Sequence, residues 1–466
     1  MLTLVTLTKW FVVLLNCRTD KVVMEFLQEQ GSVTALTFRS EPRAPNMLVS
    51  GSSSGALVCW DLDKKKLAFV REEAHLGAVV EAKFLPGEPR LVSSGADNSL
   101  QMWIFDLPDG SMRLLKGRQG AAGPIRKFDF YGELGTQVLV ASEYRGQGLF
   151  GRASLIQQHR DKQWSQSVLQ KVIANKGASD TFWPGLRKQK RLPPIVDSAF
   201  SHIRHFDWAA VVTCHQDYPW AFVWSAATGS LIRKTLCIGP VRQGESPNAI
   251  CVDVSVCGNF AVVGYEDGSL HRYNMQSGLH RGPFLSDKYE QGEGKQKKVV
   301  EVKAHTARVC SVIMTVGSTI SACSDPNSAG IKIWNTMSQK LLKTVDLSDV
   351  AKGAHIQFIR ASAGSDVLVA VAFSDGRVVL VDLDAERVVR QFESVGGASC
   401  TDIAFSSDGR WLCVANTTAR AAATASTSES TAAGSTISSR SKPSPWAPSA
   451  AAAAALAALS QLWCDA

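Results

Sequence analysis

The feature that most constrains this chain is a unit of short strands and turns that recurs along it. One copy begins with an alternating apolar and polar segment at 33–38. It continues through an apolar strand at 47–50 and a Gly/Ser turn, and its third strand ends in Trp60. The next copy has the same order, and its third strand ends in Trp103. The two tryptophans lie about 43 positions apart, which is the period expected for four strands per repeat.

Weaker copies follow these two. Each has an apolar strand, a turn and a second strand, and the copies begin near residues 125, 208, 250, 308, 366 and 401. A single four-stranded blade has two apolar faces that it cannot bury alone, so such blades pack radially around a ring. We therefore predict an all-β fold made of WD-repeat β-propeller blades.

Some residues of the second copy fit the polar set that often ties such a blade together. In that set, here called the blade tie, a turn aspartate six positions before the tryptophan is linked by hydrogen bonds to a histidine, a strand serine or threonine, and the indole N–H. His75, Ser93 or Ser94, Asp97 and Trp103 stand in these places. Each bond stabilises a blade by about 1 kcal/mol. We interpret the His–Asp pair as structural, because no placed serine or cysteine nucleophile accompanies it.

Other units carry variants of this set. Asp267 precedes Tyr273 by the same step, so a tyrosine stands in the tryptophan position. Ser54 occupies the aspartate position of the unit that ends in Trp60, and we expect the tie to be absent there. The same structural role is predicted for residues of the later units, namely His305, Asp325, Trp334 and Asp375.

The composition indicates a globular protein without a disulfide framework. Hydrophobic residues make up 45% of the chain, which is enough for a core. None of the 11 cysteines stands in a C-x-x-C pair, and several lie in apolar runs, which fits a reducing compartment. The apolar run at 10–15 follows Lys9 and is too short to span a bilayer, so we interpret it as a strand that turns into a second strand at 21–26. We predict no membrane segment.

Two patterns that could suggest chemistry are weak. The glycine string at 146–151 matches a dinucleotide motif, but the stretch after it is a poor candidate for the helix that such a site requires. His202, His205, Cys214 and His215 have no second pair with zinc-ligand spacing. We predict no enzymatic activity, no cofactor, no metal and no small-molecule substrate.

Three stretches break the repeat. The segment 162–194 is polar, then basic, and ends in two prolines, as an exposed linker would, while 289–303 is expected to be a loop between blades. An Ala/Ser/Thr tract at 417–460 has no strand pattern and is expected to be disordered. The basic residues of the first two stretches are either solvated surface charge or contacts for RNA phosphates; they are Arg187, Lys188, Lys190, Arg191, Lys295, Lys297 and Lys298.

Longer strings carry a more specific signal than the repeat. They are GNFAVVG at 258–264, YNMQSGLHRGPF at 273–284, GADNSLQMWIF at 95–105, RLPPI at 191–195 and FSSDGRWL at 405–412. On these strings, most of the chain between residues 9 and 415 resembles a eukaryotic family of nucleolar WD-repeat proteins. That family is the tandem-propeller subunit of the UTP-B subcomplex of the small-subunit processome.

The resemblance implies two seven-bladed propellers in tandem and then a helical region. We therefore expect the closing blades of a first propeller at 1–161 and a basic, proline-containing linker at 162–197. The opening blades of a second propeller would lie at 198–415, with a low-complexity tail at 416–466. Two such incomplete rings would leave unpaired strand edges, which favour aggregation.

The resemblance also implies a role. Members of this family act as a non-catalytic scaffold in pre-rRNA processing and small ribosomal subunit assembly. The implied location is the nucleus, in the nucleolus. Partners would be other WD-repeat subunits of the processome, with pre-rRNA or snoRNA nearby. Two alternatives remain open: a generic WD-repeat adaptor such as a ubiquitin-ligase substrate receptor, and an oxidoreductase that uses the glycine string.

Overall fold

Short antiparallel strands make up nearly all of the structure. The computed structural model describes residues 10–17, 21–41, 44–107, 111–119, 121, 123–132, 135–155, 162–169, 191–238, 246–291, 298–326, 329–362, 365–392 and 399–416. Within these ranges the strands form eight four-stranded sheets and one two-stranded sheet. The predicted all-β, WD-repeat blade architecture is therefore confirmed.

The first four blades along the chain are consecutive meanders. Blade 1 consists of β3 (Val33–Phe38), β4 (Met47–Ser52), β5 (Leu57–Asp61) and β6 (Lys66–Arg71). Blade 2 consists of β7 (Val79–Phe84), β8 (Arg90–Gly95), β9 (Leu100–Ile104) and β10 (Arg113–Arg118). Blade 3 consists of β11 (Ile125–Tyr131), β12 (Gln137–Tyr144), β13 (Gln147–Ser154) and β14 (Lys162–Gln163). Blade 4 consists of β15 (Ile195–Phe200), β16 (Val211–His215), β17 (Ala221–Ser225) and β18 (Ser230–Leu236).

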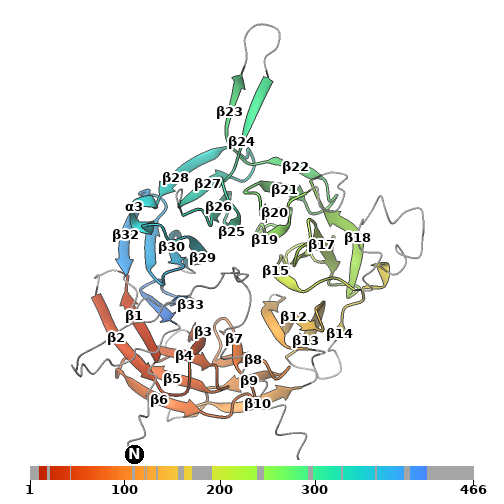
Figure 1. Ribbon diagram of the computed structural model, residues 1–466. Coiled ribbons are helices and arrows are strands. Elements are labelled where there is room, and N and C mark those ends of the chain that lie inside the picture. The colour runs from red at the N-terminus through yellow and green to blue at the C-terminus, as the bar shows by residue number, and fades with distance from the viewer. Residues whose placement is uncertain are drawn as a thin grey trace, which may run out of the picture. The chain divides into compact units, whose positions relative to one another are not determined.

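Three further meanders follow. Blade 5 consists of β19 (Ala249–Val254), β20 (Phe260–Tyr265), β21 (Leu270–Asn274) and β22 (His280–Pro283). A two-stranded ribbon, β23 (Leu285–Gln291) and β24 (Lys298–Lys303), projects outward after it (Figure 1). Blade 6 consists of β25 (Val309–Met314), β26 (Ser318–Cys323), β27 (Gly330–Asn335) and β28 (Leu341–Asp346). The helix α3 (Ser348–Ala351) leads to blade 7, which consists of β29 (Ile356–Ser362), β30 (Ser365–Phe373), β31 (Val378–Asp382) and β32 (Arg387–Phe392).

The remaining blade, here called the closing blade, combines strands from both ends of the described chain. Its inner strands are β33 (Cys400–Phe405) and β34 (Trp411–Asn416), and its outer strands are β1 (Trp10–Asn16) and β2 (Lys21–Gln28). β1 pairs antiparallel with β34, so that Leu14 lies opposite Cys413. The apolar run near the start of the sequence is therefore a strand followed by a second strand, as predicted.

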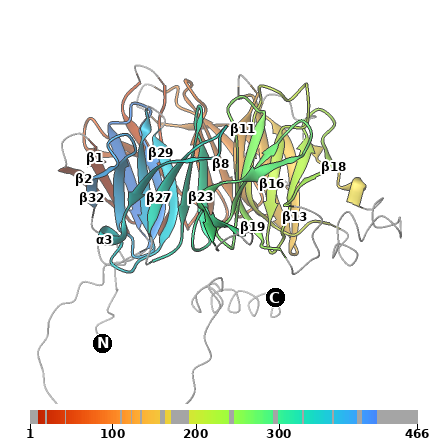
Figure 2. The ribbon, with the colours of Figure 1, turned by 90° about the horizontal axis from the view of Figure 1, so that it is seen from above.

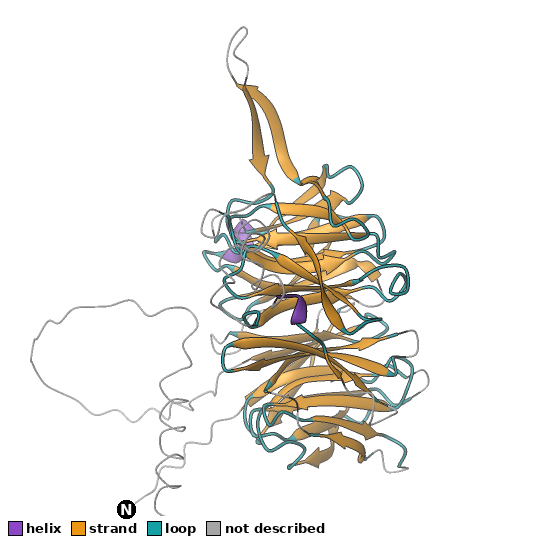
Figure 3. Cartoon of the chain, turned by 90° about the vertical axis from the view of Figure 1, so that its right-hand side faces the viewer, coloured by secondary structure: helices purple, strands orange, loops and turns teal. Residues whose placement is uncertain are grey.

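The blades surround a common axis (Figure 1). The first strand of each blade lies nearest that axis, and the fourth strand lies at the rim. In the closing blade the strands are counted outward from the axis, so that β33 is its first strand and β2 its fourth. Figures 2 and 3 show the same blades edge-on, stacked side by side around the ring. Because every blade is an antiparallel meander, the turns that join its first strand to its second lie on one face of the ring. We call this side the first-turn face.

The structure differs from the expectation of two open rings. The described residues between 10 and 416 lie in one compact unit, in which blades from both predicted propellers share a single ring. Strand β14 belongs to blade 3 and β15 to blade 4, so both ends of the predicted 162–197 linker carry blade strands. The physical reason is edge pairing: an open ring exposes unpaired strand edges, and the β1–β34 ladder removes them. The predicted tail, apart from Asn416, lies outside the described residues.

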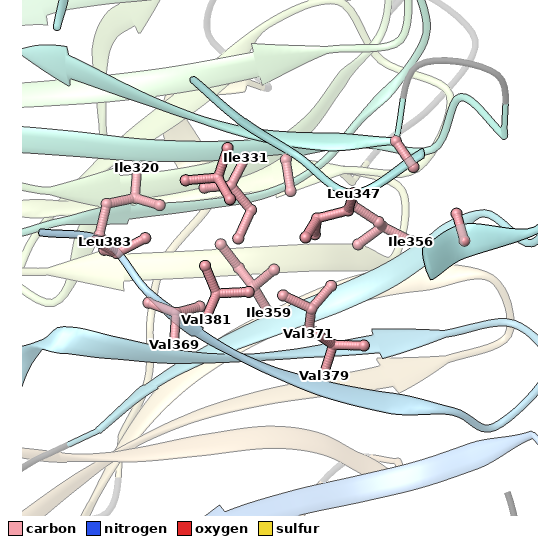
Figure 4. Packing of buried hydrophobic residues seen from close by; sticks show 14 of the residues in the cluster. Ile320, Ile331, Leu347, Ile356, Ile359, Val369, Val371, Val379, Val381 and Leu383 are labelled. Carbon is pink, nitrogen blue, oxygen red and sulfur yellow. The ribbon is translucent and has the colours of Figure 1, made fainter. Parts of the chain in front are cut away.

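The core consists of apolar layers between neighbouring blades. Second strands are the most buried, and every residue of β4 is buried, whereas the rim strand β6 is mostly exposed. Figure 4 shows the layer between blades 6 and 7, where Ile331 and Leu347 on one side meet Ile359, Val371 and Val379 on the other. A blade thus buries its faces only against its neighbours, as the repeat implies.

All of the cysteines in the described part of the chain are free, and most are buried. Burial raises the pKa of the Cys59 thiol to about 12, so this cysteine is a packing residue rather than a reactive one. Among the described residues, no helix has the length and apolar character needed to cross a membrane.

Candidate functional site

The polar tie predicted for blade 2 is formed by residues from three places in the sequence. Trp103 Nε1 donates to Ser93 Oγ (2.9 Å), and Ser93 Oγ lies 2.7 Å from His75 Nε2. On the other side of the imidazole, His75 Nδ1 lies 3.2 Å from Asp97 Oδ1, which also accepts a bond from Ser99 Oγ (2.7 Å). Burial lowers the pKa of His75, against the opposing effect of Asp97, so the imidazole is neutral at neutral pH.

Blade 6 has a shorter version of this tie. Trp334 Nε1 donates to Ser321 Oγ (2.8 Å), which lies 2.7 Å from His305 Nε2. Burial lowers the pKa of His305 to about 3. Asp325, the predicted fourth member, instead accepts a bond from Thr306 Oγ1 (2.6 Å).

Blade 1 has a tie that the sequence did not reveal. Trp60 Nε1 donates to Ser50 Oγ (3.1 Å), and Ser50 Oγ donates to Gln28 Oε1 (2.6 Å). Gln28 is fully buried and belongs to β2 of the closing blade. The aspartate-dependent tie is missing, as expected from Ser54, but a glutamine takes the place of the histidine. Only its position before the first strand of the blade could have indicated this role.

Blade 4 shows a third variant. Trp224 Nε1 donates to Thr213 Oγ1 (2.8 Å), which lies 2.9 Å from His215 Nε2. His215 Nδ1 lies 2.6 Å from Pro193 O, and burial lowers the histidine pKa to about 4. This histidine, weighed above as a zinc ligand, is thus part of a blade tie.

The other predicted blade residues are placed differently from the predicted pattern. Tyr273 Oη lies 2.7 Å from Tyr265 Oη, and the bonds of Asp267 go to Ser269 and to Lys303 Nζ (2.8 Å). Asp375 accepts bonds from the backbone and guanidinium of Arg377.

A second polar system joins neighbouring blades near the axis. The third residue of a first strand is an acid in three blades, and each acid accepts a backbone N–H from the next blade. Glu81 binds the N–H of Phe128 (2.7 Å), Asp197 that of Val252 (3.0 Å), and Asp402 that of Leu36 (2.9 Å). Asp253, two positions further along its strand, binds the N–H of Met314 (2.6 Å). This repeat of acids was not recognised in the sequence.

Lysines complete this system at two blade interfaces. Lys83 Nζ lies 2.5 Å from Asp129 Oδ1 and donates to Phe128 O (2.8 Å), while Lys127 Nζ lies 3.0 Å from both Asp197 Oδ1 and Ser198 O. The charged members Lys83, Asp129, Lys127 and Asp197 line a cavity of about 790 Å³ between the first strands. Since each of these charged side chains bonds to the neighbouring blade, we interpret the system as a structural connection between blades rather than a reaction site.

The two weak patterns have structural explanations. Gly148 lies where an added Cβ would be 2.2 Å from Pro193 O, so this glycine permits a close backbone approach, and the string continues as strand β13 rather than a helix. Cys214 and His215 are buried in β16, whereas His202 lies in the exposed turn that precedes it. In the described residues, no group of three or more His, Cys, Asp or Glu is arranged to hold a metal ion.

Most of the predicted RNA-contact residues lie outside the part of the chain that the structure describes. These are Arg187, Lys188, Lys190, Lys295 and Lys297. Arg191 is exposed just before blade 4, and Lys298 is the first residue of β24. Their contact with RNA stays a prediction.

Comparison with known proteins identifies two matching domain families. The WDR36/Utp21 second beta-propeller domain matches residues 126–423, and the WDR36/Utp21 first beta-propeller matches residues 3–106. The first-propeller match ends after β9 of blade 2, and the second-propeller match begins in β11, the first strand of blade 3.

Curated relatives match most of this chain but are much longer. WD repeat-containing protein 36 of Homo sapiens is 31% identical over 402 residues, which is 86% of this chain and 41% of that protein. U3 small nucleolar RNA-associated protein 21 homolog of Schizosaccharomyces pombe is 30% identical over 87% of this chain and 40% of its own length. U3 small nucleolar RNA-associated protein 21 of Saccharomyces cerevisiae is 28% identical over 86% and 40%. The chain thus spans about two fifths of the relatives it matches.

Solved structures support the fold. The computationally designed Ika8 protein matches with a TM-score of 0.55 at 16% identity, over 83% of this chain and 96% of its own. Saccharomyces cerevisiae Sqt1 matches with a TM-score of 0.56 at 12% identity, over 83% and 95%. Because the second-propeller match alone covers more than half of the residues, this chain belongs to the WDR36/Utp21 family of WD-repeat β-propeller proteins.

Proposed function

We propose that this chain is a non-catalytic scaffold segment of the small-subunit processome, which supports pre-rRNA processing and small ribosomal subunit assembly in the nucleolus. The observation that carries the proposal is the family match over 126–423, together with relatives named for association with the U3 small nucleolar RNA. Its partners would be other WD-repeat subunits of the processome, near pre-rRNA or snoRNA.

The geometry is consistent with a scaffold. The buried histidines of blades 2, 4 and 6 are linked through a hydroxyl to tryptophans, and the acids of the first strands accept backbone N–H groups of the next blade. These groups therefore contribute to the rigidity of the ring. A rigid ring that carries many turns on two faces suits a protein that holds several partners.

The central test is co-purification at near-physiological salt. An affinity-tagged chain, expressed in cells of its own species, is expected to enrich U3 snoRNA and pre-rRNA over a tagged unrelated propeller. Enrichment of cullins without these RNAs would support the rival adaptor function and overturn the proposal.

The basic linker allows a separate test of direct RNA contact. Changing Arg187, Lys188, Lys190 and Arg191 to glutamate is expected to reduce RNA crosslinking, because these cations would no longer neutralise phosphates. The matched control changes Lys64, Lys65 and Lys66 to glutamate, which lie in the exposed turn after β5 and at the start of β6. Equal crosslinking of both variants and the wild type would contradict RNA contact by the linker and leave the scaffold role standing.

A further inference from the structure

Large apolar side chains are exposed on the first-turn face of three consecutive blades. In blade 4, Phe206 is 86% exposed and Ile203 is 53% exposed. In blade 5, Val256 is 55% exposed, and in blade 6, Val316 is 82% exposed. Single exposed apolar residues are common, but a set on adjacent blades of one face is typical of a protein-binding surface. We call these three turns (201–208, 255–258 and 315–317) the apolar turn set.

The closing blade shows that the fold does not require apolar residues in such a turn. Its first turn is Ser406-Ser407-Asp408-Gly409, and that of blade 5 is Ser255-Val256-Cys257-Gly258. Both turns have the same bonds: the fourth residue donates its N–H to the first carbonyl, and the first hydroxyl accepts an N–H five residues on. Both also place their glycine at positive φ, 73° and 65°. The same backbone turn therefore forms with Ser-Asp or with exposed Val-Cys, and the aspartate adds bonds from the Ser406 hydroxyl and the Arg410 N–H.

The turns of the set are joined to one another. Ser201 Oγ donates to Val256 O (3.2 Å), and Trp208 Nε1 donates to Gly258 O (3.2 Å), which links the turns of blades 4 and 5. The bond from Met314 N–H to the Asp253 carboxylate links the strand ends from which the turns of blades 5 and 6 begin. The apolar side chains are thus presented on a connected frame rather than on independent loops.

The charge of the set favours a protein over a nucleic acid. Apart from histidines, its charged residues are Arg204 and Asp207, which form an ion pair (3.1 Å). The Arg204 guanidinium also lies 5.5 Å from the centre of the Trp208 ring. A surface that binds phosphates needs an excess of cations, whereas this one is neutral. It complements an uncharged, apolar surface.

We propose that the apolar turn set is a docking surface for an uncharged, apolar face of another subunit of the UTP-B subcomplex. This inference rests on the proposed function for its choice of partner. The exposed side chains of Phe206 and Val316 are the expected anchors, because the largest and most exposed apolar groups lose most water-accessible area on docking.

The test measures affinity of the full chain for the other UTP-B subunits of the same species, co-expressed and purified. The test variant combines Phe206→Ser, Val256→Ser, Cys257→Asp and Val316→Asn, which gives blade 5 the turn of the closing blade. Its affinity is expected to fall by about tenfold or more, since several anchors are lost at once. The matched control makes the reverse change, Ser407→Val with Asp408→Cys, and is expected to bind like the wild type. Thermal melting of both variants checks that the ring is intact.

The outcomes are separable. Wild-type affinity in a folded test variant would overturn the docking surface and leave the scaffold role intact. Failure of the wild-type chain to bind any UTP-B subunit would instead overturn the proposed function, and with it this partner. A wild-type dimer that the test variant converts to a monomer would show that a second copy, not another subunit, covers the set. Loss of U3 RNA crosslinking with unchanged subunit affinity would show that RNA occupies it, and would overturn the proposal.

Discussion

Blades 1 and 6 hold the tryptophan-bound serine with different residues. In blade 6 the tryptophan-bound serine is held by His305, and in blade 1 it is held by Gln28. The indole–hydroxyl bond has nearly the same length in both, 2.8 Å in blade 6 and 3.1 Å in blade 1. What the blade requires is a buried polar group that can bond to the hydroxyl, and the residue type is secondary. The residue type does decide one property, since only the histidine can take up a proton, and it does so near neutral pH once the chain unfolds.

The largest expected effect removes the tryptophans themselves. Trp334→Ala and Trp60→Ala are each expected to lower the free energy of unfolding by about 3–5 kcal/mol, because both side chains are buried and leave cavities. Chemical denaturation measures the two losses. Comparable losses would support the equivalence of the two ties, whereas a much smaller loss for Trp60→Ala would show that blade 1 is held mainly by other contacts.

A smaller effect follows from removing the shared hydroxyl. Ser321→Ala and Ser50→Ala each leave the indole N–H and its neighbouring polar group without this partner, at a cost of about 1–3 kcal/mol. The measurement is again the free energy of unfolding, with Ser407→Ala in an exposed turn as the control. If Ser50→Ala costs as little as the control, Gln28 does not function as the counterpart of His305.

The exchange of the histidine for glutamine tests the comparison directly. His305→Gln copies the blade 1 tie and is expected to change stability by less than about 1 kcal/mol at pH 7.5. The folded pKa of His305 is about 3, below its usual value of 6.5. The wild type is therefore fully stabilised above pH 6.5 and loses stability as the pH falls toward 3, because the unfolded state takes up the proton first. The variant is expected to lose less stability over this range, as measured by melting at several pH values.

The reverse exchange has the smallest expected effect at neutral pH. Gln28→His is expected to leave the stability at pH 7.5 nearly unchanged and to add a loss of stability below pH 6.5, because a histidine buried at this position would also have a lowered pKa. An unchanged pH profile would indicate that water reaches this position or that the β2 side chain at position 28 does not pack against blade 1. Hydrogen exchange of the Ser50 amide would separate these two explanations.

Much of the fold could be predicted from local sequence. The strands of blades 1 and 2 follow from alternating apolar residues, turn glycines and the spacing of Trp60 and Trp103, all within about 40 residues. The set His75, Ser93 or Ser94, Asp97 and Trp103 was identifiable because its residue types and spacing are characteristic, and the structure selects Ser93. Weaker repeats were less informative: Asp267 and Tyr273 have the right spacing, yet the structure pairs Tyr273 with Tyr265.

The bonds between blades could not be predicted in the same way. Glu81, Asp197 and Asp402 occupy one strand position, but an acid near the middle of a strand is ordinarily an exposed residue. Its role appears only when the backbone of the next blade lies beside it. For Asp402 that backbone belongs to Leu36, 366 residues away in the sequence. Desolvation raises the pKa of Asp402, a change that no local pattern contains.

The sequence by itself determined the repeating unit, because pleated strands and tight turns depend on residues within one blade. Only the tertiary structure decided how many blades share a ring, which strands close it, and that Gln28 supports Trp60. These features depend on how blade faces and strand edges are buried against parts of the chain that are distant in sequence. Any strand edge that fits can provide the free energy of that pairing, so local sequence does not specify the partner. The sequence therefore specified the blades, and the pairing of β1 with β34 specified the ring.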